Sequence, residues 1–239
     1  MALKIILCIL FGYLVGGINP SYIIGRLRGI DVRKDGSGNA GASNALILMG
    51  KAVGAFSAIF DIFKAAVVMW LVPVIFGTLP MGPEIAGVAC AIGHMFPAYM
   101  RFKGGKGLAC LGGLFIAIDW RLFFIVLAVE IVIVLLVDYI CVVPITGSIL
   151  LPVLYGLLGS DGTGWLKRAE AGWGGALILA CLALVMLYKH IQNLRRIARG
   201  TEVHFSFLWS KDKAALIETA RQNELRWLEK KAAKKAAKK

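Results

Sequence analysis

Long apolar runs alternate with short polar segments along almost the whole chain. They cover residues 2–24, 52–76, 84–100, 108–118, 121–137, 139–159 and 173–189. Most are long enough to cross about 30 Å of hydrocarbon as α-helices. The run 108–118 is short for a span, so a tilted, re-entrant or partly inserted helix stays open there. The pattern predicts an all-α integral membrane protein with about seven transmembrane helices.

Basic residues are concentrated in three of the segments that connect these runs. Cytoplasmic connections of membrane proteins carry an excess of Lys and Arg. Even numbers of apolar runs separate the basic segments, so one orientation places all of them in the cytoplasm. The N-terminus and the loop 160–172 then lie outside and the C-terminus lies inside. The cations after the first run also favour a retained helix over a cleaved signal peptide. They are Arg26, Arg28, Arg33 and Lys34, then Arg101, Lys103 and Lys106, then Lys189, Arg195, Arg196 and Arg199.

Composition excludes a soluble domain, since 59% of the 239 residues are apolar, 17% are charged and the mean hydropathy is +0.76. The net charge of +13 is uneven, because residues 211–239 hold ten Lys or Arg against four acidic residues. A basic segment beside a membrane more often meets anionic lipid headgroups than nucleic acid. We therefore expect a membrane domain at 1–205 and a basic cytoplasmic tail at 206–239, with membrane lipids as partners and no nucleic acid.

The segment 36–44 combines glycines with short polar side chains, directly after a basic stretch. Glycine lets successive backbone N–H groups turn inward without a Cβ in the way, and hydroxyl and amide groups add donors. An apolar helical run follows, so the loop also stands at a positive helix end. This pattern indicates a phosphate-binding loop at a membrane surface. Its candidate residues are Gly36, Ser37, Gly38, Asn39, Gly41, Ser43 and Asn44. A dinucleotide site is excluded because no βαβ unit surrounds these glycines.

A second glycine-rich segment lies in the next basic loop and reads Lys103-Gly104-Gly105-Lys106. Ammonium groups beside a flexible backbone suit a phosphate oxygen, which both N–H groups and a lysine can hold. A basic anchor with a tight turn is the alternative. Two glycine-rich loops on one side of the membrane favour phosphate binding.

A third polar cluster stands at the inner end of the last apolar run. His190, Asn193 and Arg196 are three residues apart, so they share one face of a helix. A single His at a helix end is usually a capping or interfacial residue. A face of three such residues, beside two glycine-rich loops, favours recognition of a phosphorylated, polyhydroxylated substrate.

Ionisable residues also occur inside the apolar runs. Asp61 and Lys64 are spaced to face each other on one helix, and His94 and Glu130 lie in other runs. Such groups normally face the protein interior, and a simple intrahelical ion pair explains the first two equally well. The five cysteines lie in or beside apolar runs without metal-ligand spacing, so we expect buried side chains and no metal site.

Taken in order and spacing, the three polar segments resemble the motifs of the bacterial acyl-phosphate:glycerol-3-phosphate acyltransferases, the PlsY family. The resemblance rests on residues 36–44, on Gly93-His94 with Phe102-Lys103-Gly104-Gly105-Lys106-Gly107, and on His190-x-x-Asn193-x-x-Arg196 with Gly200-Thr201-Glu202. It covers about residues 1–205. It implies a seven-helix acyltransferase domain in the bacterial inner membrane, with its active site on the cytoplasmic face and no cofactor.

The resemblance also implies a reaction and a set of roles. An acyl chain moves from acyl phosphate to the 1-hydroxyl of glycerol 3-phosphate, which gives 1-acylglycerol 3-phosphate (lysophosphatidate) and phosphate in phospholipid biosynthesis. Ser37, His190 and Asn193 are implied as catalytic residues, and Glu202 supports the third motif. The implied substrate-binding residues are Gly36, Gly38, Asn39, Gly41, Ser43, Asn44, Lys103, Gly104, Gly105, Lys106, Arg196 and Glu202.

The chain departs from the family pattern at one phosphate-binding position. Ile47 stands where the family usually has Arg, so a bidentate phosphate donor is lost. Either a nearby cation such as Arg33 or Lys51 takes over, or the protein is a weakly active or non-catalytic member. A membrane carrier for phosphate or a phosphorylated metabolite is the other alternative. A carrier, however, is expected to show inverted halves and polar groups spread through its spans.

Overall fold

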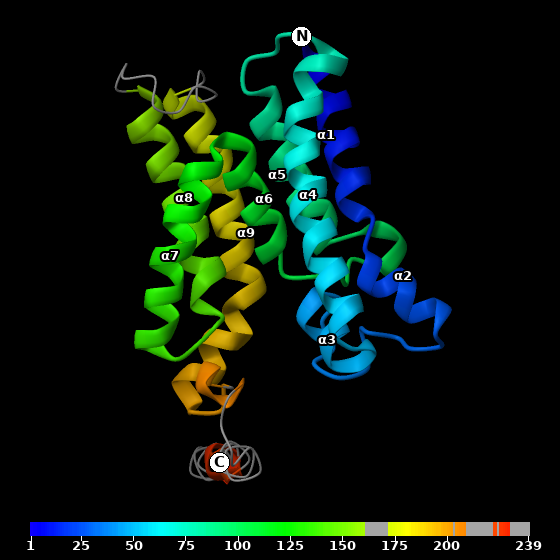
Figure 1. Ribbon diagram of the computed structural model, residues 1–239, viewed down its shortest axis with the longest axis vertical. Helices are drawn as coiled ribbons and strands as arrows, with labels where there is room; N and C mark the ends of the chain where they lie inside the picture. Colours follow the sequence, from blue (N-terminus) through cyan, green and yellow to red (C-terminus); the bar gives the residue numbers. More distant parts are fainter. Residues whose placement is uncertain (161–171, 203, 209–221, 224, 230–239) are drawn as a thin grey trace, which may run out of the picture.

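The computed structural model describes residues 1–160, 172–202, 204–208, 222–223 and 225–229, and every regular element in these ranges is helical (Figure 1). The predicted all-α fold is therefore confirmed for this part of the chain. The predicted outer loop 160–172 and the predicted tail 206–239 fall mostly outside the described residues. The α-helices are α1 (Ala2–Gly17), α2 (Pro20–Leu27), α3 (Ala42–Met49), α4 (Lys51–Phe76), α5 (Gly82–Met95), α6 (Leu108–Ile118), α7 (Trp120–Val137), α8 (Val142–Ser160) and α9 (Gly172–Arg199). Two short 3₁₀ helices are η1 (Ala98–Met100) and η2 (Phe205–Leu208).

Within the described residues, four helices are long and apolar enough to cross a membrane, namely α4, α7, α8 and α9, and the pair α1–α2, bent by 41°, makes a fifth span if it is taken as one. The helices α5 and α6 have 14 and 11 residues. With a rise of about 1.5 Å per residue they extend only about 21 and 16 Å, less than the hydrocarbon core. The protein is thus a multi-pass membrane protein, whereas the count of seven spans and the orientation remain predictions.

The run 84–100 is shorter as a helix than its apolar residues suggest. Helix α5 ends at Met95, and Phe96 leaves the helical region with φ −134° and ψ 56°. The cause is Pro97, because its ring disfavours a helical conformation of the residue before it. The following segment turns back through η1 toward α2 (Figure 1).

The first apolar run is also divided. Asn19 precedes Pro20 at the start of α2, and its side chain accepts a hydrogen bond from the N–H of Tyr22 at 2.9 Å. The amide of Asn19 donates to the carbonyl of Ala40 at 2.8 Å. This fully buried residue therefore caps α2 and also holds the end of the segment 36–41 against it.

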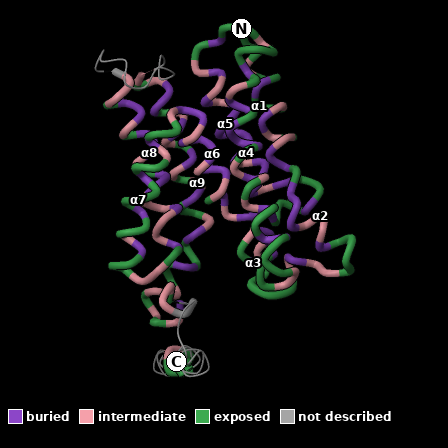
Figure 2. The backbone as a smooth tube through the Cα atoms, viewed as in Figure 1, coloured by how far each residue is buried: buried purple, intermediate pink, exposed green. Residues whose placement is uncertain are grey.

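Helices α1 and α5 approach each other closely because glycine faces the contact. A Cβ at Gly12 would lie 2.2 Å from the carbonyl oxygen of Ala86, and one at Gly16 would lie 2.0 Å from that of Cys90. Small residues one turn apart allow such backbone contact between membrane helices. Buried residues accordingly gather on the inward faces of the bundle (Figure 2).

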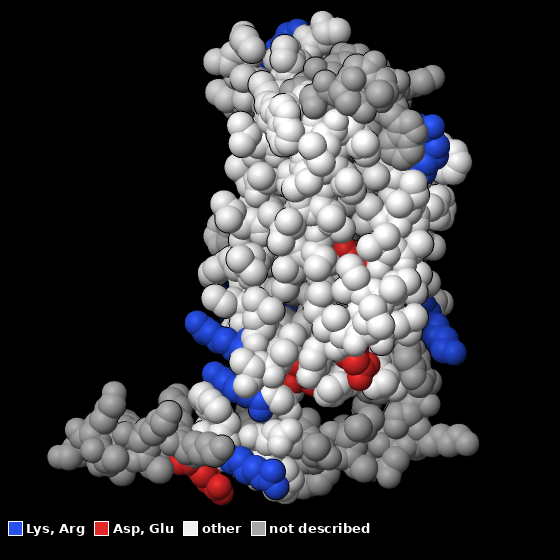
Figure 3. Space-filling view, turned by 90° about the vertical axis from the view of Figure 1, so that its left-hand side faces the viewer, with Lys and Arg blue, Asp and Glu red and all other residues white. Residues whose placement is uncertain are grey.

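Charge is distributed unevenly along the long axis of the molecule. Figure 3 shows a broad band with almost no charge across the upper and middle parts and most of the visible cations in the lower half, the half that holds α3 and the end of α9. Among the cysteines, Cys8, Cys90, Cys110 and Cys141 are buried as expected. Cys181 is exposed, which corrects the prediction that all five are buried, because it lies on the outward face of α9.

The two ends of the bundle are expected to lie on opposite sides of the membrane. Thr78, between α4 and α5, and Lys103, after α5, both have exposed side chains. A membrane-impermeant maleimide should label Thr78→Cys in right-side-out vesicles and Lys103→Cys only in inverted ones. Wild-type protein gives the background from the native cysteines. Labelling of Lys103→Cys from the periplasmic side would overturn the predicted orientation.

Candidate active site

The glycine-rich loop before α3 is shaped from within by Asn44. Its Oδ1 accepts from the N–H of Ser37 at 2.8 Å, and its Nδ2 donates to the carbonyls of Val32 at 2.9 Å and Asp35 at 3.0 Å. Gly36 lies against this amide with φ +62°, and a Cβ there would be 2.3 Å from Oδ1. Asn44 is fully buried, so its amide holds the loop and is not presented to a ligand.

The hydroxyl groups of the same region face outward. Ser37 in the loop and Ser43 in the first turn of α3 are exposed, and Asn39 is half-buried. Helix α3 begins after Gly41 without a side-chain cap, so the positive end of the helix stands beside these groups. The predicted set therefore divides into Asn44 and Gly36, which build the loop, and the outward-facing groups, which remain available to a substrate.

Arg33 connects this loop to the next one. Its guanidinium pairs with Asp31 at 2.8 Å, donates to the carbonyl of Met100 at 3.1 Å and stacks over the ring of Tyr22 at 4.8 Å. The hydrogen bond from Arg33 holds the pKa of Asp31 well below its usual range. These contacts give Arg33 a structural role. Ile47, on α3, is 66% exposed and contributes no polar group.

Gly104 and Gly105 pack directly on the end of α5. Their N–H groups donate to the carbonyls of Met95 at 3.2 Å and His94 at 3.1 Å. A Cβ at Gly105 would lie 2.0 Å from Nε2 of His94, so only glycine fits there. This corrects the expectation that both N–H groups point at a phosphate. The adjacent lysines differ, since Lys103 is exposed and Lys106 turns inward.

Lys106 begins a chain of hydrogen bonds that joins the second loop to the end of α9. Its Nζ donates to Oδ1 of Asn193 at 2.8 Å, and Nδ2 of Asn193 donates to Oε1 of Glu202 at 2.6 Å. The other oxygen of Glu202 pairs with Nε of Arg196 at 2.6 Å. Burial lowers the pKa of Lys106, and the nearby charge of Arg196 lowers it further. The structure thus brings these four sequence-predicted residues together.

His190 lies one helical turn before Asn193 and is 2% exposed. Its Nδ1 stands 2.9 Å from the carbonyl oxygen of Met186, which can only accept. A neutral imidazole in this position therefore carries its proton on Nδ1, and Nε2 keeps a lone pair. Neighbouring Lys189 donates to the carbonyl of Met95 at 3.0 Å and lies over the ring of Phe96 at 4.5 Å, so α9 is fixed against the end of α5.

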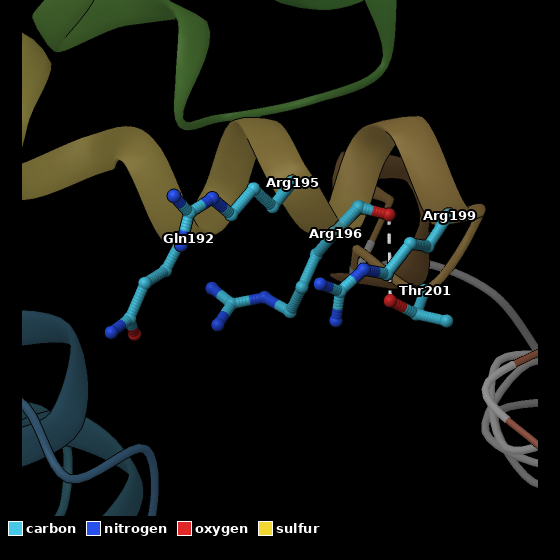
Figure 4. A pocket seen from close by; sticks show the side chains of 5 residues that line it. All are labelled: Gln192, Arg195, Arg196, Arg199 and Thr201. Atoms are coloured by element: carbon cyan, nitrogen blue, oxygen red, sulfur yellow. Dashed lines mark hydrogen bonds between the residues drawn. The ribbon is translucent and has the colours of Figure 1, made fainter. Parts of the chain in front are cut away.

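A cationic pocket of about 330 Å³ opens beside this chain of hydrogen bonds. In Figure 4 the guanidinium groups of Arg196 and Arg199 extend into open space from one side of α9, with Thr201 beyond them. The hydroxyl of Thr201 is 3.4 Å from the carbonyl oxygen of Arg196. The lining residues are Gln192, Arg195, Arg196, Arg199 and Thr201.

Three residues that organise the site were missed in the sequence. Asn19 and Lys189 have recognisable signals, because Asn before Pro is typical of a helix start and Lys189 stands directly before His190. Arg33 was considered as one of the basic loop residues and as a substitute for an arginine at position 47, but not as a link between two loops. Its bond to Met100 joins segments 67 residues apart in the chain, which no local pattern indicates.

Known proteins are similar to this chain in sequence and in fold. Residues 6–200 match the family model described as Glycerol-3-phosphate acyltransferase. Glycerol-3-phosphate acyltransferase 1 of Oceanobacillus iheyensis is 34% identical over 211 residues, covering 84% of this chain and 95% of that protein. A glycerol-3-phosphate acyltransferase of Thermotoga petrophila is 33% identical over 194 residues, covering 81% and 92%.

The crystal structure of PlsY, an integral membrane glycerol 3-phosphate acyltransferase, in its glycerol 3-phosphate form has a similar fold, with a TM-score of 0.70 and 27% sequence identity. The match covers 85% of this chain and 96% of that one. The lysophosphatidic acid form of PlsY matches equally well, also with a TM-score of 0.70.

Asn44 is expected to be the main support of the first glycine-rich loop. Asn44→Ala leaves the N–H of Ser37 and the carbonyls of Val32 and Asp35 without this partner, and an unsatisfied buried group such as the Val32 carbonyl costs about 1–3 kcal/mol. The thermal unfolding midpoint of the detergent-solubilised protein should fall. Ser43→Ala, whose side chain is exposed on the same helix, is the control and should leave the midpoint unchanged. Equal midpoints for the two variants would contradict this role.

Proposed function

Because the chain belongs to the glycerol-3-phosphate acyltransferase family, we propose that it transfers a fatty acyl group from acyl phosphate to the 1-hydroxyl of glycerol 3-phosphate. The products are 1-acylglycerol 3-phosphate (lysophosphatidate) and inorganic phosphate. The reaction belongs to phospholipid biosynthesis and takes place at the cytoplasmic face of the bacterial inner membrane.

The hydrogen-bond chain from Lys106 to Arg196 is the observation that carries this proposal. Asn193 is fixed on both sides, because Lys106 donates to its Oδ1 and its Nδ2 donates to Glu202, while each of these atoms keeps capacity for a second hydrogen bond. An ammonium has three donors and a guanidinium has five. After the bonds to Asn193 and Glu202, donors of Lys106 and Arg196 remain to meet phosphate oxygens. Such a preformed, cationic arrangement suits a doubly charged phosphate monoester.

The chemistry requires positioning more than activation. Acyl phosphate is a mixed anhydride, so the glycerol hydroxyl attacks its carbonyl carbon, an ester C–O bond forms, and the bond from the acyl carbon to the phosphate oxygen breaks. The hydroxyl proton passes either to the departing phosphate or to Nε2 of His190, the nitrogen that the bond to Met186 leaves as an acceptor. The exposed hydroxyl of Ser37 is assigned to the phosphate of the donor.

An apolar groove provides space for the acyl chain. It has a volume of about 330 Å³ and lies between α1, α2 and the segment after α5. Tyr13, Ile18 and Pro97 are among its lining residues. Its position beside the second loop fits a substrate whose phosphate lies at the polar end of the bundle and whose hydrocarbon chain lies along the outer face of the helices.

The donor is expected to be acyl phosphate and not acyl-CoA, because the glycine-rich loop is sized for a compact phosphate. Purified protein in detergent should release phosphate from palmitoyl phosphate only when glycerol 3-phosphate is also present, and EDTA should not abolish this release. Activity with palmitoyl-CoA alone as donor would contradict the assignment. The carrier alternative is tested in proteoliposomes, where uptake of labelled glycerol 3-phosphate without phosphate release from palmitoyl phosphate would support it.

His190, Asn193 and Ser37 are each expected to contact the reacting groups. Replacing any of them by Ala should lower kcat/KM by about 30- to 1000-fold, equivalent to about 2–4 kcal/mol of transition-state stabilisation, while the protein remains inserted in the membrane. Ile191→Ala, at an exposed neighbour of His190, is the matched control and should keep its activity. If His190→Ala turned over at the wild-type rate, the departing phosphate would be the proton acceptor and His190 a helix-end residue.

A further inference from the structure

Three ionisable side chains form a buried cluster that the proposed reaction does not use. Asp61 and Lys64 on α4 and His94 on α5 are 1%, 5% and 3% exposed. Nζ of Lys64 lies 2.6 Å from Oδ1 of Asp61 and 3.1 Å from Nδ1 of His94, which is itself 3.3 Å from the same oxygen of Asp61. The intrahelical ion pair that the spacing suggested is thus present, and a residue from a second helix completes it.

Lys64 also holds the junction between α1 and α2. Its Nζ donates to the carbonyl of Gly16 at 2.9 Å and to that of Ile18 at 2.7 Å. The last carbonyls of a helix have no partner within the helix, and one ammonium satisfies two carbonyls at this bend. The next residue is Asn19, which holds Ala40 at the end of the first glycine-rich loop. Ile18 and Asn19 therefore connect Lys64 to that loop.

His94 makes the corresponding connection to the second glycine-rich loop. Gly105 packs on its imidazole so closely that a Cβ would lie 2.0 Å from Nε2, and the N–H of Gly105 donates to the carbonyl of His94. Gly105 directly precedes Lys106, whose Nζ donates to Asn193. The buried cluster thus contacts the first glycine-rich loop through the α1–α2 bend and the second one through Gly105.

We propose that Lys64, held by Asp61 and His94, is a positioning residue that fixes the two glycine-rich loops relative to each other across the active site. Its catalytic consequence rests on the proposed function, whereas its effect on the loops does not. Stability alone is a weak explanation, because replacing a buried ion pair by apolar residues of similar volume is often neutral or stabilising. What the pair supplies is a defined geometry, with one ammonium donating to carbonyls at the α1–α2 bend.

The double variant Asp61→Leu/Lys64→Met tests the proposal without leaving an unpaired buried charge. Glu84→Gln is the control, because Glu84 is buried on α5 and accepts a hydrogen bond from Tyr155 away from both loops. Hydrogen–deuterium exchange of the segments 28–41 and 98–107 should become at least about tenfold faster in the double variant and remain unchanged in the control. His94→Leu, which keeps the ion pair, should accelerate exchange in 98–107 only. It also provides the test if the double variant does not fold.

Steady-state kinetics then measure the consequence for the reaction. The double variant should raise the KM for at least one phosphorylated substrate by about tenfold, normalised to folded protein, because looser loops lose binding to ground and transition states alike. Unchanged exchange in either loop, or unchanged KM for both substrates, would reduce the cluster to a structural ion pair and overturn the proposal. A wild-type protein without phosphate release would refute the proposed function, while the exchange data would still decide the positioning role of Lys64.

Discussion

Backbone polar groups at a helix end near hydrocarbon need partners from the protein itself, and this constraint decides the arrangement at the end of the bundle that carries the polar segments. Helix α1 ends at Gly17, and the ammonium of Lys64 takes two carbonyls at that point. Helix α5 ends at Met95, whose carbonyl accepts from Lys189 and from the N–H of Gly104. The partners of these helix ends lie on α4, on α9 and in the second glycine-rich loop. Satisfying the helix ends therefore places the polar segments beside one another.

The charged side chains at the same end of the molecule fall into two groups: some are fully engaged in structural contacts, and others keep donors for a substrate. Arg33 is committed to Asp31 and Lys64 to Asp61, in each case with further bonds to backbone carbonyls. Lys106 and Arg196 share a single carboxylate, Glu202, through Asn193 and directly. Two cations around one carboxylate leave a positive charge, which suits an anionic substrate.

The hydrophobic pattern was sufficient for the long helices, because length and apolar character decide what lies in a membrane. It could not give the break at Asn19 or the end of α5 at Met95, since both depend on a following proline inside an apolar run. The motifs identified the segments of the site, but not which residues in them support the loops and which are available to a substrate. Glycine at 104 and 105 looks equally suitable for a phosphate and for close packing, and only the position of His94 decides for packing. Asn44 likewise faces the interior of its own loop, which its residue type does not reveal.

Isoleucine in place of the family's usual arginine at position 47 changes which residues are available to bind phosphate. Position 47 lies on the exposed side of α3, one helical turn after the exposed Ser43, so isoleucine there leaves this face of α3 without a cation. Arg33 is held by Asp31 and Met100 and is poorly placed to substitute for it. Lys51, the other candidate substitute, is exposed at the start of α4, whereas Lys106 on the second loop and Arg196 on α9 stand together at the site and keep donors. Within the proposed reaction, cations of the second and third motifs then neutralise most of the phosphate charge. The first loop contributes hydroxyl groups and the positive end of α3. Correct placement of the two loops relative to each other matters more under these conditions, because fewer strong contacts hold the substrate on the side of α3.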